Sequence, residues 1–127
     1  MKTIGFIDRH IDEYHANKYP QFIRESALGG QFRVTHAWAE VNPPGKKPLD
    51  QWCREQDITQ ADSIEQVVDA CDCIVVLSPD NVERHEALSR LPLMSGKPVF
   101  IDKPFVDSLA AGRRMIELAG QHHTPMF

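Results

Sequence analysis

The chain has 127 residues, of which 42% are hydrophobic and 25% charged, a composition typical of a globular domain that buries roughly two thirds of its unfolded surface. Eighteen acidic residues against 14 basic ones, with no basic run, argue against nucleic acid as a partner. No apolar stretch has the length of a membrane span or a signal-peptide core, and the three cysteines include no Cys-x-x-Cys pair. We therefore expect a cytoplasmic protein without membrane contact.

Apolar spacing divides the chain into alternating strands and helices. Pro20 either kinks the first helix or starts a second piece, Asp62 or Ser63 caps the third helix, and Asp80 or Asn81 caps the fourth. In chain order, the predicted elements are a strand over residues 3–7, a helix over 13–28, a strand over 33–41, a helix over 49–56, a brief strand over 58–60, a helix from 64, a strand over 73–77, a helix from about 81 to 88, a strand over 99–101 and a helix over 108–121.

This alternation predicts a parallel sheet with helices on both faces. We expect an α/β fold, a three-layer Rossmann-like sheet with strand order 3-2-1-4-5, in a single domain over residues 1–127. The unbroken apolar run at 73–77 predicts a central strand that is buried on both faces.

Three segments resemble one known family. Residues 96–104, Gly-Lys-Pro-Val-Phe-Ile-Asp-Lys-Pro, resemble the Glu-Lys-Pro strand of the Gfo/Idh/MocA oxidoreductases, with Asp102 where that family usually has Glu. The apolar run that ends in Ser78-Pro79 is similar to the family's strand ending in Thr-Pro, and residues 108–119 are similar to its next helix. The resemblance implies NAD or NADP as cofactor, and a sugar, polyol or related hydroxyl-bearing small molecule as substrate. It also implies a second, substrate-binding domain, which would follow where this sequence stops.

Lys103 is the candidate catalytic residue. The proline after it holds Lys103 extended at the carboxyl end of its strand, where open α/β sheets bind their ligands. By resemblance, Lys103 would orient the substrate hydroxyl and help its proton leave. The resemblance also implies cofactor contacts for Ser78, Pro79, Asp102 and Lys103.

The turn after the first strand departs from the dinucleotide-binding pattern. That pattern is Gly-x-Gly-x-x-Gly, because the pyrophosphate approaches the backbone closely, but residues 8–13 read Asp-Arg-His-Ile-Asp-Glu. Two interpretations stay open. In one, side chains of the turn, Asp8, Arg9 and His10, contact the cofactor; in the other, the fold has lost its cofactor. Glu40, at the end of the second strand, lies where an acid holds the adenosine ribose and favours NAD over NADP.

The polar residues in and just after the same turn allow other functional interpretations. Asp8, His10, Asp12 and His15 are potential ligands of a divalent metal and suggest, as a less favoured alternative, a metal-dependent hydrolase. Their spacing matches no specific metal signature, so we assign no metal. A further alternative is a non-catalytic Rossmann-like module that binds a small molecule or nucleotide. His85 is expected on a helix surface, and the open edge of the sheet predicts a possible homodimer.

Overall fold

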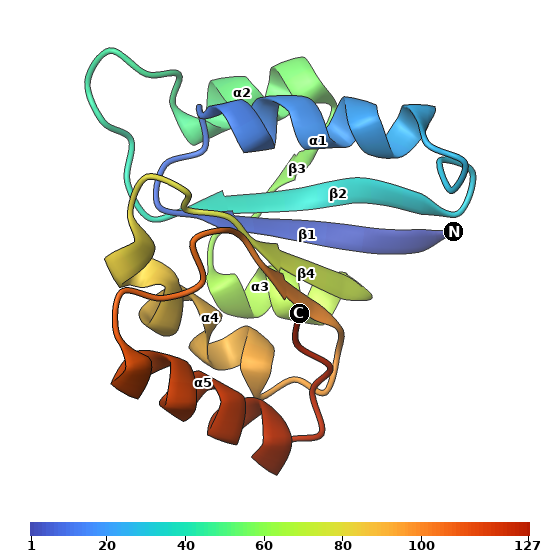
Figure 1. Cartoon of the computed structure of the whole chain (residues 1–127). Helices are drawn as coiled ribbons and strands as arrows, with labels where there is room; N and C mark the ends of the chain where they lie inside the picture. The colour runs from blue at the N-terminus through green and yellow to red at the C-terminus, as the bar shows by residue number, and fades with distance from the viewer.

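A computed structural model describes residues 1–127 and shows one parallel sheet between two layers of helices (Figure 1). The strand order is β3-β2-β1-β4-β5, and every neighbouring pair is parallel. The Rossmann-like topology predicted from the sequence is thus confirmed. The strands are β1 (Lys2–Asp8), β2 (Phe32–Ala39), β3 (Thr59–Gln60), β4 (Cys73–Val76) and β5 (Val99–Ile101).

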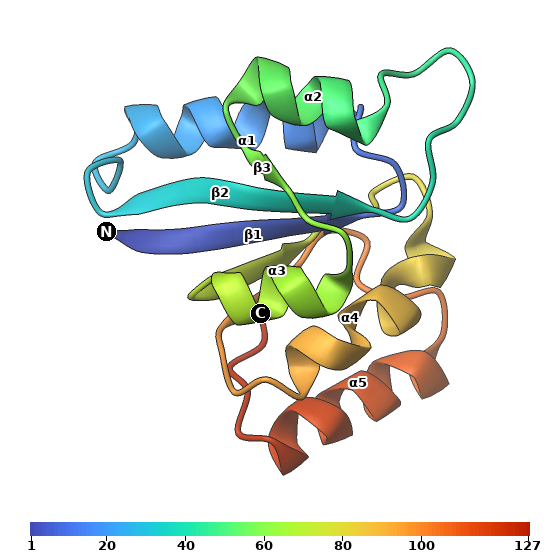
Figure 2. The ribbon, with the colours of Figure 1, turned by 180° about the vertical axis from the view of Figure 1, so that it is seen from behind.

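Five helices cover the sheet, and they divide between its two faces (Figures 1 and 2). None of them has both the length and the apolar character needed to cross a bilayer. One face carries α1 (Tyr14–Glu25) and α2 (Leu49–Gln56), and the other carries α3 (Ile64–Ala70), α4 (His85–Leu93) and α5 (Leu109–Gln121).

The central strand β1 supplies side chains to both layers because successive residues of a strand point to opposite faces. Ile4 and Phe6 join the cluster under α1 and α2, whereas Ile7 joins the cluster under α3, α4 and α5. Gly5 faces α3 so closely that a Cβ atom there would lie 2.3 Å from Cγ1 of Val67. This close packing of α3 fixes the position of β1, whose carboxyl end carries Asp8.

Several predicted details of the elements are confirmed and others are wrong. Pro20 lies inside one helix, and Ser63 caps α3 through the N–H of Gln66. Asn81 precedes a 3₁₀ turn (Val82–Arg84), but its side chain makes no capping hydrogen bond, and α4 begins only after Arg84, so neither Asp80 nor Asn81 caps α4. Residues of β4 alternate between buried and half-buried, so full burial on both faces is not observed.

The register of β1, β4 and β5 sets the level of their carboxyl ends. Ile7 pairs with Val76, and Val76 pairs with Ile101. The residues that follow, Asp8 of β1 and Asp102 after β5, therefore emerge at the same end of the sheet. At the other side of β5, residues 125–127 run parallel to it, since the N–H of Ile101 donates to the carbonyl of Phe127 at 2.8 Å.

Candidate functional site

A buried carboxyl group stands at the end of β1. Asp8 is 1% exposed, and its Oδ1 accepts the N–H groups of Arg9 at 2.8 Å and Ser78 at 3.0 Å. Its Oδ2 is buried and receives no N–H donor. Burial, and next the adjacent Glu13 carboxyl group, raise the pKa of Asp8 from 3.8 to about 10. Asp8 is therefore protonated at neutral pH, because its charged form would be buried beside the carboxylate of Glu13.

Glu13 caps the helix that follows this turn. Its Oε2 accepts the N–H of His15 at 2.7 Å, and its Oε1 accepts the N–H of Ala16 at 2.8 Å. The side chain reaches these donors because Glu13 itself is extended at the N-cap position and only 6% exposed. The N–H groups that a helix N-terminus offers to a phosphate are thus already occupied by a carboxylate of the same chain.

The first turn of α1 meets the end of β5 through a histidine and an acid. His15 Nδ1 is hydrogen-bonded to Oδ2 of Asp102, and Asp102 is 1% exposed. The other carboxylate oxygen, Oδ1, accepts the N–H of Lys103 at 2.9 Å. The imidazole of His15 stacks on Tyr19, with ring centroids 5.0 Å apart and planes inclined by 9°. Burial, and next the nearby Asp102 carboxylate, raise the pKa of Tyr19.

Lys103 follows this buried acid directly. Its backbone is fixed by the bond to Asp102, and the Lys103–Pro104 peptide bond is cis. The side chain is exposed, and its ammonium group makes no ion pair or hydrogen bond within the chain. The structure therefore places Lys103 as a free cation just beyond the carboxyl end of β5.

Glu40, at the end of β2, is held by two arginines. Arg9 Nη1 donates to Oε1 at 2.7 Å, while Arg84 donates through Nε to Oε1 at 2.9 Å and through Nη2 to Oε2 at 2.6 Å. The hydrogen bond from Arg84 is the main cause of the lowered pKa of Glu40. Sequence analysis missed Arg84, because no motif marks it and it lies 44 positions from its partner.

The candidate metal ligands of the first turn do not converge. His10 Nε2 lies 3.7 Å from Oδ2 of Asp80, and Asp12 accepts hydrogen bonds from the Asn17 side chain and the Lys47 backbone. Asp8 and His15 have the separate partners described above. No group of three or more histidine, cysteine, aspartate or glutamate side chains is arranged to hold a metal ion. The four potential ligands on which the hydrolase alternative was based therefore do not form a cluster.

The end of β4 is held by a buried histidine. His85 is fully buried, with Nε2 at 2.7 Å and 2.9 Å from the carbonyl oxygens of Leu77 and Ser78, and Nδ1 at 2.8 Å from that of Phe105. The expectation of a surface histidine was wrong, because α4 begins with His85 directly under the end of the strand. Ser78 adopts a left-handed φ of 54°, which this bonding secures, and Pro79 is half-buried beside it.

The best-defined hollow of the domain lies away from these residues. It has a volume of about 480 Å³ and is found where α1 and α2 end, near the start of β2. Pro20, Ile23, Phe32, Glu55 and Ile58 are among its lining residues, and none of the predicted site residues is. We give more weight to the carboxyl end of the sheet, because open α/β sheets bind ligands there.

The topology and the polar residues at the carboxyl ends of β1, β4 and β5 define a Rossmann-type α/β domain. The chain belongs to the Gfo/Idh/MocA oxidoreductase family, since residues 6–127 match the family described as "Oxidoreductase family, NAD-binding Rossmann fold". No curated protein sequence matches the chain.

Solved structures of similar fold cover nearly all of the chain. A dehydrogenase from Clostridium difficile is 25% identical with a TM-score of 0.75, and the match covers 98% of this chain and 38% of that one. UDP-N-acetylglucosamine 3-dehydrogenase from Acidithiobacillus ferrooxidans is 13% identical with a TM-score of 0.74, covering 98% and 36%. The WlbA dehydrogenase from Bordetella pertussis, in complex with NADH and UDP-GlcNAcA, is 15% identical with a TM-score of 0.78, covering 98% and 36%. The chain thus spans less than two fifths of these proteins.

The first turn does not fit a pyrophosphate held in the usual backbone cradle. Glu13 occupies the N–H groups at the start of α1, and Asp8 fills the space under the turn. The turn is also tied to the end of β2, because the N–H of Val41 donates to the carbonyl of Arg9 at 2.9 Å. A dinucleotide at this edge would have to be held by side chains instead.

Proposed function

We propose that this chain is the amino-terminal domain of an oxidoreductase that acts on a hydroxyl group of a sugar, a polyol or a related small molecule. Family membership supports the reaction class. Two structural neighbours, a UDP-N-acetylglucosamine 3-dehydrogenase and a dehydrogenase in complex with UDP-GlcNAcA, support the substrate class. Since the chain spans 36% of each neighbour, the complete activity is proposed for the whole protein.

The position of Lys103 is the observation that carries this proposal. A free ammonium group at the carboxyl end of β5 can donate a hydrogen bond to a substrate oxygen and lower the cost of removing its proton. The buried carboxylate of Asp102 fixes the backbone from which the lysine side chain extends. Lys103 is thus proposed as the residue that orients the hydroxyl group.

We further propose NAD rather than NADP as the preferred dinucleotide. The carboxylate of Glu40 lies at the end of β2, where an acid contacts the adenosine ribose in this type of fold, and it would repel a 2′-phosphate. Arg9, whose side chain is 34% exposed, is proposed to pair with the phosphates, because Glu40 would keep its two bonds from Arg84. His10, Ser78 and Pro79 line the same edge.

Titration of NADH and NADPH by calorimetry tests this proposal on the full chain. We expect saturable NADH binding that is tighter than NADPH binding and that weakens about 10-fold in Arg9→Ala, because one charge-assisted hydrogen bond is lost. Arg33→Ala is the matched control, since Arg33 forms an exposed pair with Asp57 at the other end of β2. Absence of binding at millimolar NADH would contradict the dinucleotide part of the proposal.

One observation favours a second function, a binding module that takes a small molecule without a dinucleotide. The N-terminus of α1 is capped by Glu13, whose carboxylate already accepts the N–H groups of His15 and Ala16 and would repel a phosphate. Under this alternative, NADH and NADPH fail to bind while a neutral ligand still binds at the carboxyl end of the sheet. The same titrations, repeated with polyols, separate the two functions.

We also propose that the whole protein forms a homodimer, because an edge strand of a sheet can pair with another chain. Sedimentation equilibrium of the whole protein checks this proposal. A monomer over the micromolar range would contradict it.

A further inference from the structure

The two ring nitrogens of His15 have different surroundings. Nδ1 is bonded to Oδ2 of the buried Asp102, and because a carboxylate can only accept, Nδ1 carries the proton. In the neutral ring, Nε2 therefore holds the free lone pair. Nε2 makes no hydrogen bond within the chain and is not among the buried atoms that lack a partner, while the side chain is 16% exposed. An unpaired acceptor thus reaches the surface at the carboxyl end of the sheet.

The packing holds the imidazole in one orientation. Tyr19 stacks on one face of the ring at 5.0 Å, and Tyr14 meets it edge-on at 6.0 Å with the planes inclined by 68°. Asp102 is itself oriented, because its second oxygen accepts the N–H of Lys103. A histidine whose tautomer and plane are both set by neighbours is the arrangement that proton transfer requires.

The charges around His15 select the kind of ligand. The Asp102 carboxylate is bonded to the ring, and the Glu13 carboxylate accepts the backbone N–H of the same residue. An anionic group bound at Nε2 would meet these acids, whereas a neutral hydroxyl group would donate to Nε2 without electrostatic cost. The exposed ammonium group of Lys103, one residue after Asp102, can complete the contact to a ligand oxygen.

We propose that His15 is an acid/base group of a small-molecule site at this end of the sheet, that Asp102 is its positioning residue, and that the site takes a hydroxyl group of a neutral polyhydroxylated compound. The hydroxyl O–H donates to Nε2. On proton transfer the O–H bond breaks and its electron pair stays on the oxygen, whose negative charge the Lys103 ammonium group can offset. An N–H bond forms at Nε2, and the charge of the resulting imidazolium is balanced by Asp102. The ligand class rests on the proposed function, but the dyad does not depend on any dinucleotide.

Long-range ¹H–¹⁵N correlation spectra of the histidine rings test the dyad in the full chain without ligand. We expect His15 in the Nδ1–H tautomer, with Nε2 at the resonance position of an unprotonated ring nitrogen. In Asp102→Asn the proton should move largely to Nε2, whereas in Asp107→Asn, at an exposed position of the same loop, the tautomer should not change. If His15 of the wild type carries its proton on Nε2, the proposal is overturned. The wild-type spectrum alone decides this, whether or not the variants fold.

The ligand class is tested by following the Nε2 resonance during titration with sorbitol and with gluconate. These compounds share a six-carbon polyhydroxylated chain, but gluconate carries a carboxylate. We expect a saturable shift of the His15 Nε2 resonance with sorbitol, at least a 10-fold weaker effect of gluconate, and no shift at His10, which faces Asp80 instead. No shift with either compound, or a stronger effect of gluconate, overturns the ligand assignment.

These outcomes are independent of the cofactor measurement. If NADH does not bind but the His15 tautomer and the sorbitol response are as expected, the dyad stands and the dinucleotide part of the proposed function fails. If NADH binds and His15 has the other tautomer, the dinucleotide part of the proposed function stands and the dyad fails.

Discussion

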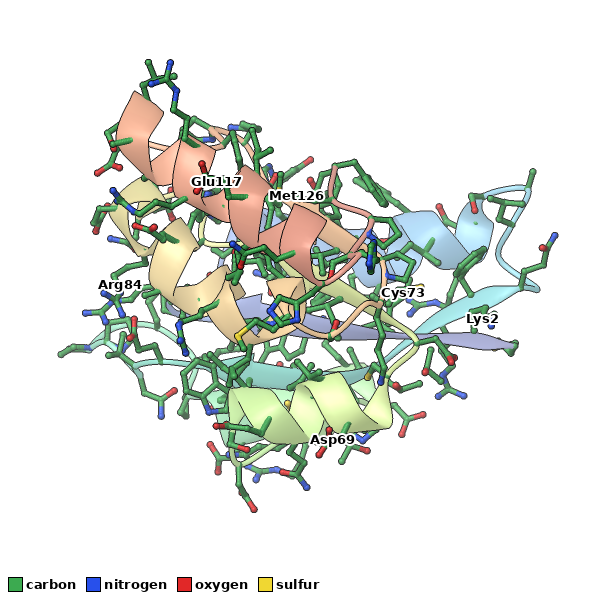
Figure 3. The ribbon with its side chains drawn as sticks, turned by 90° about the horizontal axis from the view of Figure 1, so that it is seen from below. Lys2, Asp69, Cys73, Arg84, Glu117 and Met126 are labelled. Carbon is green, nitrogen blue, oxygen red and sulfur yellow. The ribbon has the colours of Figure 1, made fainter.

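The two ends of the parallel sheet, marked by Lys2 and Cys73 at one end and Arg84 at the other in Figure 3, differ in how their polar groups are paired. At the amino end, the Lys97 ammonium group donates to the carbonyls of Val68 and Cys71, where α3 ends. At the carboxyl end, Asp8 Oδ2 and His10 Nδ1 account for two of the three buried side-chain atoms without a hydrogen-bond partner.

This difference indicates which end serves stability and which serves binding. Polar groups at the amino end are matched donor to acceptor, which is the arrangement that stabilises a fold. At the carboxyl end, acids are buried against one another, and Asp8 keeps a proton that an exposed aspartate would lose. Groups that cost stability are retained where they have another use, so the carboxyl end is the place to look for chemistry.

The largest expected effect is a gain in stability from Asp8→Asn. An asparagine keeps an oxygen for the N–H groups of Arg9 and Ser78 and presents an NH₂ group to Glu13, so it replaces the protonated acid. Since the pKa of Asp8 is raised from 3.8 to about 10, stability in the wild type falls as pH rises between these values. Urea unfolding at pH 8 should show a gain of about 2–3 kcal/mol.

Below about pH 4 the gain from Asp8→Asn should vanish, because aspartate is then protonated in the unfolded chain as well. Asp69→Asn, on the exposed side of α3, is the control and should leave the pH profile unchanged. A variant that unfolds more readily than the wild type at pH 8 would show that Asp8 is ionised in the fold.

A loss of intermediate size is expected from Thr124→Val at the amino end. The hydroxyl group of Thr124 donates to the carbonyl of Leu93 at 2.6 Å and accepts the N–H of Gly96 at 2.9 Å, and the residue is 7% exposed. Valine has nearly the same shape but pairs with neither group, so the free energy of unfolding should fall by about 1–2 kcal/mol. Thr59→Val, at an exposed strand position, should change the free energy of unfolding little. If both variants lose the same amount, the two hydrogen bonds of Thr124 do not stabilise the fold as expected.

The smallest expected effect is that of Glu40→Gln. Arg84 and Arg9 hold the pKa of Glu40 below its ordinary value, so the carboxylate stabilises the fold above that value and loses this contribution as pH falls through the folded-state pKa. Because the Glu40 side chain is 23% exposed, we expect the variant to lose only about 0.5–1 kcal/mol at pH 7. Thermal unfolding at pH 7 and at pH 3 measures this, and the loss should be smaller at the lower pH.

Glu65→Gln, on an exposed position of α3, provides the comparison for the glutamate variant and should be neutral at both pH values. A Glu40→Gln variant that differs from the wild type equally at both pH values would show that the two arginines do not act through the carboxylate charge.

The sequence determined the framework because its signals are local. Apolar spacing with the periods of strand and helix identified every element, and α2 was found with the bounds 49–56 that the structure shows. The Lys-Pro step likewise placed Lys103 at the end of β5, since the conformation before a proline depends only on neighbouring residues. The alternation of strands and helices predicted a parallel sheet, and the strand order was the one expected of a Rossmann-like arrangement.

Only the tertiary structure decided how the polar residues pair. His15 and Asp102 are 87 positions apart and meet because the register aligns the ends of β1, β4 and β5. The burial of His85 likewise depends on where α4 starts beneath β4, which a capping pattern did not predict. Local patterns specify which face a residue occupies, but hydrogen bonds between distant side chains depend on packing to within a few tenths of an ångström. The folded chain therefore shows what its sequence could not, a histidine and a buried acid joined at the edge where this fold binds ligands.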